Sequence, residues 1–188
     1  MTNLRLGIVG RNGSGKSSVC DYLKSKGFNV VSLSDVVRYH AKKRGLNDDR
    51  ITLTQLANEL KTERGLDYFA QASIAHAKHF KDVVFDSIRH PSEVELFQQH
   101  QITLLGVDAD LKDCYDRIKM RGKGTDFVTF EEFKAQDDYE MSGQSHGQCI
   151  SDCLELCNVR ITNDQDMKTL FHRVDDVLMS LKVHNHVE

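Results

Sequence analysis

Two glycines, a lysine and a serine near the amino terminus have the types and spacing needed to bind phosphate groups. Gly10, Gly15, Lys16 and Ser17 satisfy the pattern G-x-x-x-x-G-K-[ST] within the segment GRNGSGKSS. Glycines let backbone N–H groups turn toward phosphate oxygens, and a helix that follows presents its positive end to the same charge. The pattern therefore predicts that the segment from Gly10 to Ser18, here called the phosphate loop, binds phosphates.

Individual residues of the phosphate loop have different expected roles. Lys16 reaches the β and γ phosphates of a nucleotide, and the Ser17 hydroxyl can ligate Mg²⁺. An ordinary glycine-rich turn is the alternative interpretation, but the fixed spacing between an apolar run and a helical pattern argues against it. ATP and Mg²⁺ are therefore the expected cofactors. The expected ATP-binding residues in this loop are Gly10, Asn12, Gly13, Ser14, Gly15, Lys16, Ser17 and Ser18.

A candidate metal ligand and a candidate phosphate ligand follow a later apolar run, Val83 to Phe85. Asp86 ends this run, and a carboxylate at the carboxyl edge of a parallel sheet can organise Mg²⁺ together with Ser17. Capping of the next turn is the alternative role for Asp86. Arg89 lies three residues further on, where its guanidinium can bind a substrate phosphate through two hydrogen bonds.

The same D-x-x-R spacing occurs at Asp35 and Arg38, directly after the second apolar run. We expect Arg38 to bind the substrate phosphate beside Arg89, although a solvated helix face would explain Arg38 equally well. No general base is required when the acceptor is a phosphate oxygen. If the acceptor is a sugar hydroxyl, Asp35 is the candidate that would accept its proton.

A third basic feature combines Arg117 and Arg121, which lie four residues apart in a helical pattern. This helix leads into the glycine-bearing segment from Gly122 to Asp126. The arrangement suits a short lid, at about residues 117–130, that closes over the phosphates with arginines at its root. Alternatively, Arg117 and Arg121 are ordinary solvent-exposed side chains of the helix.

The elements that must position these residues alternate between short β-branched runs and longer stretches of helical period, which predicts a parallel sheet covered by helices. The expected fold is α/β with three layers and five parallel strands. The expected strands are Leu4 to Val9, Asn29 to Leu33, Val83 to Asp86, Ile102 to Val107 and Val159 to Thr162. The expected helices are Lys16 to Lys26, Asp35 to Arg44, Thr54 to Arg64, Tyr68 to Phe80, Ser92 to His100, Leu111 to Met120, Phe130 to Met141, Cys149 to Cys157 and Met167 to Leu181.

Two of these helices stand between the second and third strands, where one crossover would suffice. They predict a small helical insertion on the substrate side, at about residues 45–80. Pro91 suits the first turn of its helix. The 188 residues, of which 39% are hydrophobic, fit one domain over residues 1–188.

Composition narrows the classes of partner. The net charge is −3 and the basic residues form no long run, which disfavours a nucleic-acid partner. No membrane segment or export signal is visible, so we expect a cytoplasmic monomer or homodimer whose five cysteines are reduced.

Other residue types that could bind metal or act as acids and bases receive structural roles. Cys149, Cys153 and Cys157 fall four apart and could suggest metal, but small side chains packed on one helix explain the spacing better. Four histidines lack ligand spacing and are expected at the surface or in packing, and the acidic stretch 131–138 is expected to be a solvated helix face. These histidines are His40, His76, His79 and His90.

Together, the phosphate loop and the segments SLSDVVR, VVFDSIR and RIKMRG resemble the nucleoside monophosphate kinase group of P-loop kinases. The segments TDFVTFEEFKAQDDYEMSG and ITND are similar to the small dephospho-coenzyme A kinase-like or nucleotide-kinase-like proteins. The resemblance covers most of the chain. It implies a P-loop NTPase fold and transfer of the γ-phosphoryl group of Mg·ATP to a (deoxy)nucleoside monophosphate.

The resemblance also implies roles for single residues. Arg38 and Arg89 would hold the phosphate of the acceptor, Arg117 and Arg121 would steady the transferring group, and Asn163 would lie near the adenine. Adenylate kinases proper carry the stretch DGFPR, which this chain lacks, and this departure weighs against AMP as the acceptor. Transfer to the sugar hydroxyl of a dephospho-coenzyme A type of substrate, and a regulatory ATPase switch without a small acceptor, are the alternatives.

Overall fold

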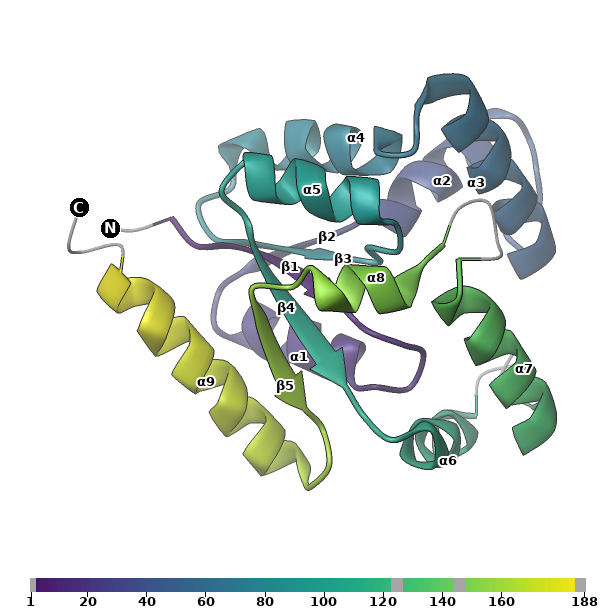
Figure 1. Ribbon diagram of the computed structural model, residues 1–188. Helices are drawn as coiled ribbons and strands as arrows, with labels where there is room; N and C mark the ends of the chain where they lie inside the picture. Colours follow the sequence, from purple (N-terminus) through teal and green to yellow (C-terminus); the bar gives the residue numbers. More distant parts are fainter. Residues whose placement is uncertain (1–2, 123–126, 144–147, 185–188) are drawn as a thin grey trace.

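The computed structural model describes residues 3–122, 127–143 and 148–184, and Figure 1 shows how their elements are arranged. In chain order these are β1 (Arg5–Val9), α1 (Lys16–Ser25), β2 (Asn29–Ser32), α2 (Leu33–Lys43), α3 (Arg50–Arg64), α4 (Tyr68–His76), the 3₁₀ helix η1 (Ala77–His79), β3 (Val83–Asp86), α5 (Pro91–Gln99), β4 (Thr103–Asp108), α6 (Leu111–Arg121), α7 (Phe130–Met141), α8 (Ile150–Glu155), β5 (Val159–Thr162) and α9 (Met167–His184).

The strands of the described chain form one parallel five-stranded sheet in the order β2-β3-β1-β4-β5. β1 is central, and Gly7 of β1 lies opposite Phe85 of β3 on one side and Leu104 of β4 on the other. A parallel strand covered on both faces must be apolar throughout, which explains the run Leu6 to Val9. The predicted α/β fold and its sheet are confirmed.

Helices cover both faces of the sheet and create two cores (Figure 1). On one face α1 and α9 pack over Leu6, Ile8 and Val107. On the other face α5, α8 and the helices that follow β2 pack over Phe85 and Leu104. A smaller cluster of buried apolar residues joins α6 to α7 beyond the carboxyl end of β4, and it contains Ala109, Cys114, Tyr115, Ile118 and Phe133.

Several boundaries differ from the sequence prediction for identifiable reasons. α3 begins at Arg50 instead of Thr54, because Asp49 caps the helix by accepting hydrogen bonds from the Thr52 backbone N–H at 2.9 Å and the Thr52 hydroxyl at 2.7 Å. The helix predicted to reach Phe80 ends earlier and continues as η1. Pro91 occupies the first helical position of α5, as predicted.

α3 and α4 stand between β2 and β3, at the place of the predicted insertion, whose position on the substrate side stays a prediction. The predicted lid is described only in part. α6 ends at Arg121, and Gly122 caps it in the left-handed conformation with a φ of 61°. Residues 123–126 of the lid prediction lie outside the described residues.

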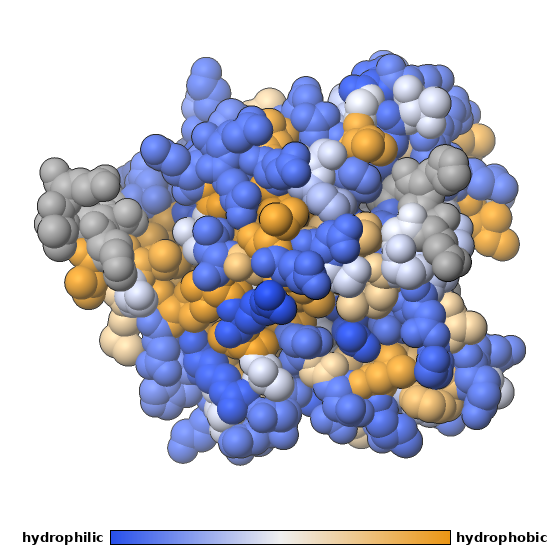
Figure 2. All heavy atoms as spheres, viewed as in Figure 1, coloured by the Kyte–Doolittle hydropathy of each residue, from blue (hydrophilic) through white to orange (hydrophobic). Residues whose placement is uncertain are grey.

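The face of the molecule shown in Figure 2 is mostly hydrophilic and is interrupted by smaller apolar patches. In the part of the chain that the structure describes, no helix combines the length and the apolar character needed to cross a membrane.

The three spaced cysteines occupy different positions around α8. Cys149 is the residue before the helix, Cys153 is buried within it, and Cys157 lies two residues beyond its end. Cys157 Sγ donates to the Cys153 carbonyl at 3.2 Å, and Cys149 Sγ donates to the Met141 carbonyl at 3.7 Å. Burial raises the pKa of Cys157 to about 12, so this thiol stays protonated at neutral pH.

Candidate functional site

The phosphate loop connects β1 to α1 at the carboxyl edge of the sheet, where ligands of open α/β folds bind (Figure 1). Two of its glycines are required by close contacts with distant elements. A Cβ atom on Gly13, where φ is 81°, would lie 2.4 Å from the Cys114 carbonyl oxygen of α6. A Cβ atom on Gly15, where φ is 106°, would lie 2.5 Å from Nδ2 of Asn163. The loop is therefore shaped by α6 and by the segment after β5.

Lys16 begins α1 and extends back over the phosphate loop. Its Nζ donates a hydrogen bond to the Arg11 carbonyl oxygen at 2.6 Å. Burial, followed by the positive charge of Arg89, lowers the pKa of Lys16 to about 8, while Asp86 and Glu140 act in the opposite direction. A buried ammonium group with a second cation nearby is a site prepared for an anion.

The predicted metal ligands fit a divalent cation. The Ser17 side chain is exposed at the first turn of α1, and Asp86 ends β3 at the same edge of the sheet. Oδ1 of Asp86 is buried and has no hydrogen-bond partner among the described residues. An orphaned carboxylate oxygen next to a phosphate loop suits Mg²⁺ or a water molecule of its hydration shell.

Arg89 lies in the β3–α5 loop, residues 87–90. Its Nη1 donates to the Gln148 side-chain oxygen at 3.0 Å and lies 4.0 Å from a carboxylate oxygen of Glu140. The side chain is 43% exposed, so solvent and ligands can reach it. Lys16 and Arg89 thus lie on the β1–α1 and β3–α5 connections at one edge of the sheet, and their shared role in binding phosphates stays a prediction.

Arg38 and Asp35 lie on the first turns of α2, beside β2. Nη1 of Arg38 donates to the Ser34 hydroxyl at 2.8 Å and to Asp35 Oδ1 at 3.2 Å, and Nε lies 3.5 Å from Asp48. Asp35 is 71% exposed. Arg38 and Arg89 therefore have separate carboxylate partners, and the expected joint role of the two arginines stays a prediction.

Arg117, Arg121 and Asn163 have different surroundings. Nη2 of Arg117 donates to the Asn163 carbonyl oxygen at 2.8 Å, and its Nη1 is buried without a hydrogen-bond partner among the described residues. The Asn163 side chain is buried and donates to the Ser14 carbonyl oxygen at 2.9 Å. Asn163 thus supports the phosphate loop, and its expected place near the adenine stays a prediction. Arg121 is an exposed residue at the end of α6.

Sequence analysis missed a link between the phosphate loop and α7. Arg11 Nη1 donates to Asp137 Oδ2 at 3.2 Å, and its Nε lies 3.7 Å from Asp108. The Asp137 and Glu140 side chains are buried, so the expectation of a solvated face over residues 131–138 is wrong at Asp137. The sequence signal was the spacing of three between Asp137 and Glu140, because residues i and i+3 lie on the same face of a helix and can be buried together.

The histidine prediction agrees with the packing at two positions. Nε2 of His40 lies 2.8 Å from the Tyr68 hydroxyl, and the His90 side chain caps α5 by accepting from the Ser92 N–H at 3.1 Å.

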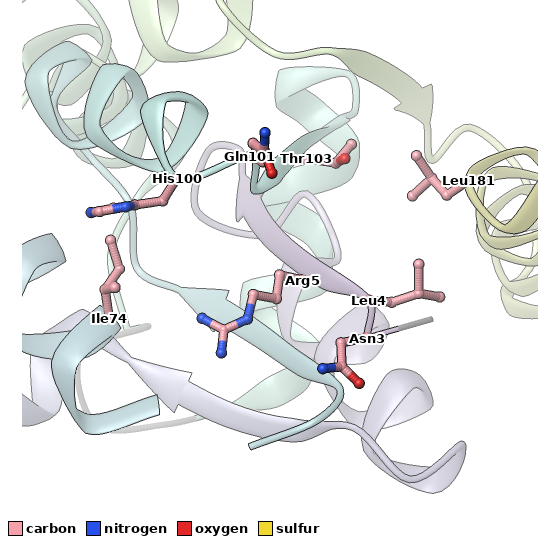
Figure 3. Close-up of a pocket in the computed structure, with 8 residues that line it drawn as sticks. All are labelled: Asn3, Leu4, Arg5, Ile74, His100, Gln101, Thr103 and Leu181. Atoms are coloured by element: carbon pink, nitrogen blue, oxygen red, sulfur yellow. The ribbon is translucent and has the colours of Figure 1, made fainter. Parts of the chain in front are cut away.

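A separate cavity of about 430 Å³ lies at the opposite, amino-terminal edge of the sheet (Figure 3). Arg5 and His100 are its basic lining residues, and one guanidinium nitrogen of Arg5 donates to the Ala77 carbonyl at 3.4 Å. Residues of the phosphate loop do not line this cavity, so it is separate from the candidate site.

The sheet order, the phosphate loop and the basic side chains at the carboxyl edge define a P-loop fold of the kinase-like type. A family model described as an AAA domain (AAA_18) matches residues 6–137. The chain therefore belongs to this AAA domain family.

Two relatives match this chain over nearly its whole length. A UPF0200 protein of Methanoculleus marisnigri is 29% identical over 180 residues, which cover 94% of this chain and 96% of the relative. UPF0200 protein MJ1399 of Methanocaldococcus jannaschii is 29% identical over 183 residues, which cover 95% and 90%.

Two solved structures share the fold at low sequence identity. TT1252 from Thermus thermophilus superposes with a TM-score of 0.65 at 20% identity and covers 96% of this chain and 99% of that chain. Shikimate kinase from Acinetobacter baumannii, in complex with shikimate, has a TM-score of 0.59 at 14% identity and covers 95% of both chains. Both structures therefore share the fold of this chain.

Proposed function

We propose that this protein is a phosphotransferase that moves the γ-phosphoryl group of Mg·ATP to a (deoxy)nucleoside monophosphate. One observation carries the proposal, namely that Arg89, whose side chain is 43% exposed, lies in the β3–α5 loop at the same carboxyl edge of the sheet as the phosphate loop. Binding ATP alone requires one anion site. A second basic side chain opposite the phosphate loop supplies a second site, for a phosphorylated acceptor.

The residues at the carboxyl edge of the sheet can supply the positioning that phosphoryl transfer requires. The phosphate loop and Lys16 hold the β and γ phosphates, while Arg89 holds the acceptor phosphate in line with them. Ser17 and Asp86 would hold Mg²⁺, which when bound neutralises charge on the phosphate oxygens. An acceptor oxygen then forms the new P–O bond as the bond to the ADP leaving group breaks.

Two arginines of α6, next to the predicted lid, can neutralise negative charge on the transferring phosphoryl group. Arg117 has one guanidinium nitrogen held by the Asn163 carbonyl and another that is buried without a partner in the described chain. Such a nitrogen can donate to a transferring phosphoryl group. Arg121 follows on the same helix and keeps the proposed role at the root of the lid.

The experiment is ADP release from Mg·ATP by the purified protein, measured with a panel of ribo- and deoxyribonucleoside monophosphates and with dephospho-coenzyme A. Strong stimulation by one monophosphate, abolished in Lys16→Ala, is the expected result. Slow hydrolysis that no acceptor changes would contradict the proposal and favour a regulatory ATPase switch. Circular dichroism of Lys16→Ala checks that the variant is folded.

A hydroxyl acceptor is the second candidate, and the exposure of Asp35 favours it. This carboxylate lies in the first turn of α2 and is open to solvent, so it could accept a proton from a sugar hydroxyl. The shikimate kinase that shares the fold has shikimate, a polyhydroxy acid, in its complex. Asp35→Asn separates the candidates, because loss of turnover with a hydroxyl acceptor indicates a base, whereas unchanged turnover with a monophosphate indicates a positional role.

A further inference from the structure

We infer that Lys61 and Glu93, which sequence analysis did not single out, position the backbone of Arg89 and thereby set the affinity of the acceptor site. The inference rests on the proposed function for the role of Arg89. Its physical basis is a buried ion pair between α3, in the helical insertion, and the first turn of α5. Lys61 and Glu93 are therefore proposed as positioning residues that act through Arg89.

Glu93 uses both of its carboxylate oxygens. Oε2 accepts hydrogen bonds from the backbone N–H of Arg89 at 2.8 Å and of His90 at 3.1 Å. Oε1 lies 3.2 Å from Nζ of Lys61. One carboxylate thus joins the β3–α5 loop to the insertion.

The Lys61–Glu93 pair is removed from solvent. The side chains are 6% and 2% exposed, and Lys61 Nζ lies 5.7 Å from the ring centre of Phe69 in α4. Surface ion pairs of this chain, such as Arg44 with Glu59 at 2.7 Å, have side chains that are 35% and 50% exposed. Screening by solvent is therefore weak at Lys61–Glu93 and strong at Arg44–Glu59.

Helix capping explains only part of this arrangement. A capping box at α5 needs Glu93 to accept from His90, the residue before the helix. It needs neither the second N–H, from Arg89, nor a buried lysine. Because a buried ion pair is often no more stable than apolar residues of the same volume, stability alone gives little reason for Lys61. A better reason for the buried lysine is that the ion pair fixes one geometry of the β3–α5 loop.

The rest of the β3–α5 loop is held on the other side. The Arg89 carbonyl oxygen accepts from the Cys149 N–H at 2.8 Å, so both backbone groups of Arg89 are engaged. Ser87 has a positive φ of 67°, which is rare for a residue with a side chain. Its hydroxyl lies 3.0 Å from the Ser32 hydroxyl at the end of β2. Arg89 therefore extends from a backbone that several elements constrain.

The test compares Lys61→Met with the double variant Lys61→Met/Glu93→Gln. Lys61→Met leaves a buried charge unpaired and should lower the melting temperature. The double variant removes both charges but keeps an amide oxygen for the loop N–H groups, so it should recover much of the stability. Arg44→Met, which removes an exposed attachment of α3, is the matched control.

The measured quantities are the KM for Mg·ATP and the KM for the monophosphate that stimulates ADP release most. In both Lys61 variants we expect the acceptor KM to rise about tenfold or more, because the side chain at position 93 loses the ammonium group that fixes its orientation, and small misplacements of a binding group have large effects. The KM for Mg·ATP should stay within twofold of the wild-type value, and Arg44→Met should change neither. An acceptor KM that recovers together with the melting temperature in the double variant would overturn the inference.

Amide hydrogen exchange keeps the inference testable if no monophosphate stimulates turnover, which is the result that rejects the proposed function itself. Faster exchange of the Arg89 and His90 amides in the double variant, with unchanged exchange in β1, would support positioning by Lys61 and Glu93. Unchanged exchange at these two amides would overturn it.

Discussion

The phosphate loop and the β3–α5 loop lie at the same edge of one sheet, yet they are built in different ways. The phosphate loop is a contiguous motif in which glycines, Lys16 and Ser17 follow one another along the chain. Arg89 in the β3–α5 loop depends on residues from several elements: Glu93 and Cys149 hold its backbone, and Gln148 accepts from its side chain. The first site is encoded locally and the second is assembled by tertiary structure.

This difference separates binding of the donor from choice of the acceptor. A local motif keeps its chemistry in many proteins with different functions, and it identifies the phosphate chemistry of ATP. An assembled site can change its geometry whenever one of the supporting elements changes. Under the proposed function, the choice of acceptor would therefore depend on the insertion and on the elements that hold Arg89.

The largest expected effect is at Lys16. Lys16→Ala removes the ammonium group that neutralises the β and γ phosphates, and kcat should fall by roughly 10²–10³-fold. The measurement is steady-state ADP release at saturating Mg·ATP. Lys24→Ala, which removes an exposed lysine from the same helix, is the control and should retain wild-type turnover. An equal fall of kcat in Lys16→Ala and Lys24→Ala would contradict a special role of Lys16 in the phosphate loop.

Arg89 should show a smaller effect that is confined to the acceptor. Arg89→Ala removes charge-assisted hydrogen bonds to a phosphate, so kcat/KM for the acceptor should fall by roughly 10²-fold while the KM for Mg·ATP stays nearly constant. Arg160→Ala, on the exposed side of β5, is the control. A rise in the KM for Mg·ATP of similar size would show that Arg89 belongs to the donor site.

Neighbouring acids on α7 test how the phosphate loop depends on a distant helix. Asp137→Asn weakens the buried contact with Arg11 and should lower the free energy of unfolding by about 2 kcal/mol, measured by urea denaturation. Asp138→Asn alters only an exposed pair with Lys134 and should cost below about 0.5 kcal/mol. Similar values for the two variants would contradict the link between α7 and the loop.

The pH dependence of nucleotide binding gives the smallest effect. Burial lowers the pKa of Lys16 to about 8, so its charged form is present below that pH and is lost above it. ATP requires the charged form, so its apparent affinity should fall about tenfold between about pH 7 and pH 9. Titration calorimetry of the wild type against Lys16→Arg checks this, since an arginine stays charged throughout. A parallel fall in both proteins would assign the pH dependence to another group.

Sequence analysis predicted local features better than assembled ones. β3 and β5 have the predicted bounds, and the phosphate loop lies between a strand and a helix as expected. Asp49 was missed as a helix cap, although an aspartate three residues before Thr52 is a recognisable signal.

The positions of Arg11, Asp137 and Asn163 could not be derived in this way. Arg11 and Asp137 are 126 residues apart in the chain, and the buried Asn163 side chain reaches the Ser14 carbonyl across 149 residues. Contacts at such separations depend on how α6, α7 and β5 pack together. Hydrophobic periodicity specifies each helix face and leaves that packing open.

The most direct test of phosphoryl transfer follows the γ-phosphorus of labelled Mg·ATP in the presence of the stimulating monophosphate. The label should appear in the acceptor as a new diphosphate, at a rate equal to that of ADP formation, and both should disappear in Lys16→Ala. Label found only in inorganic phosphate, at a rate that the acceptor leaves unchanged, would contradict a kinase and show that the protein hydrolyses ATP without an acceptor.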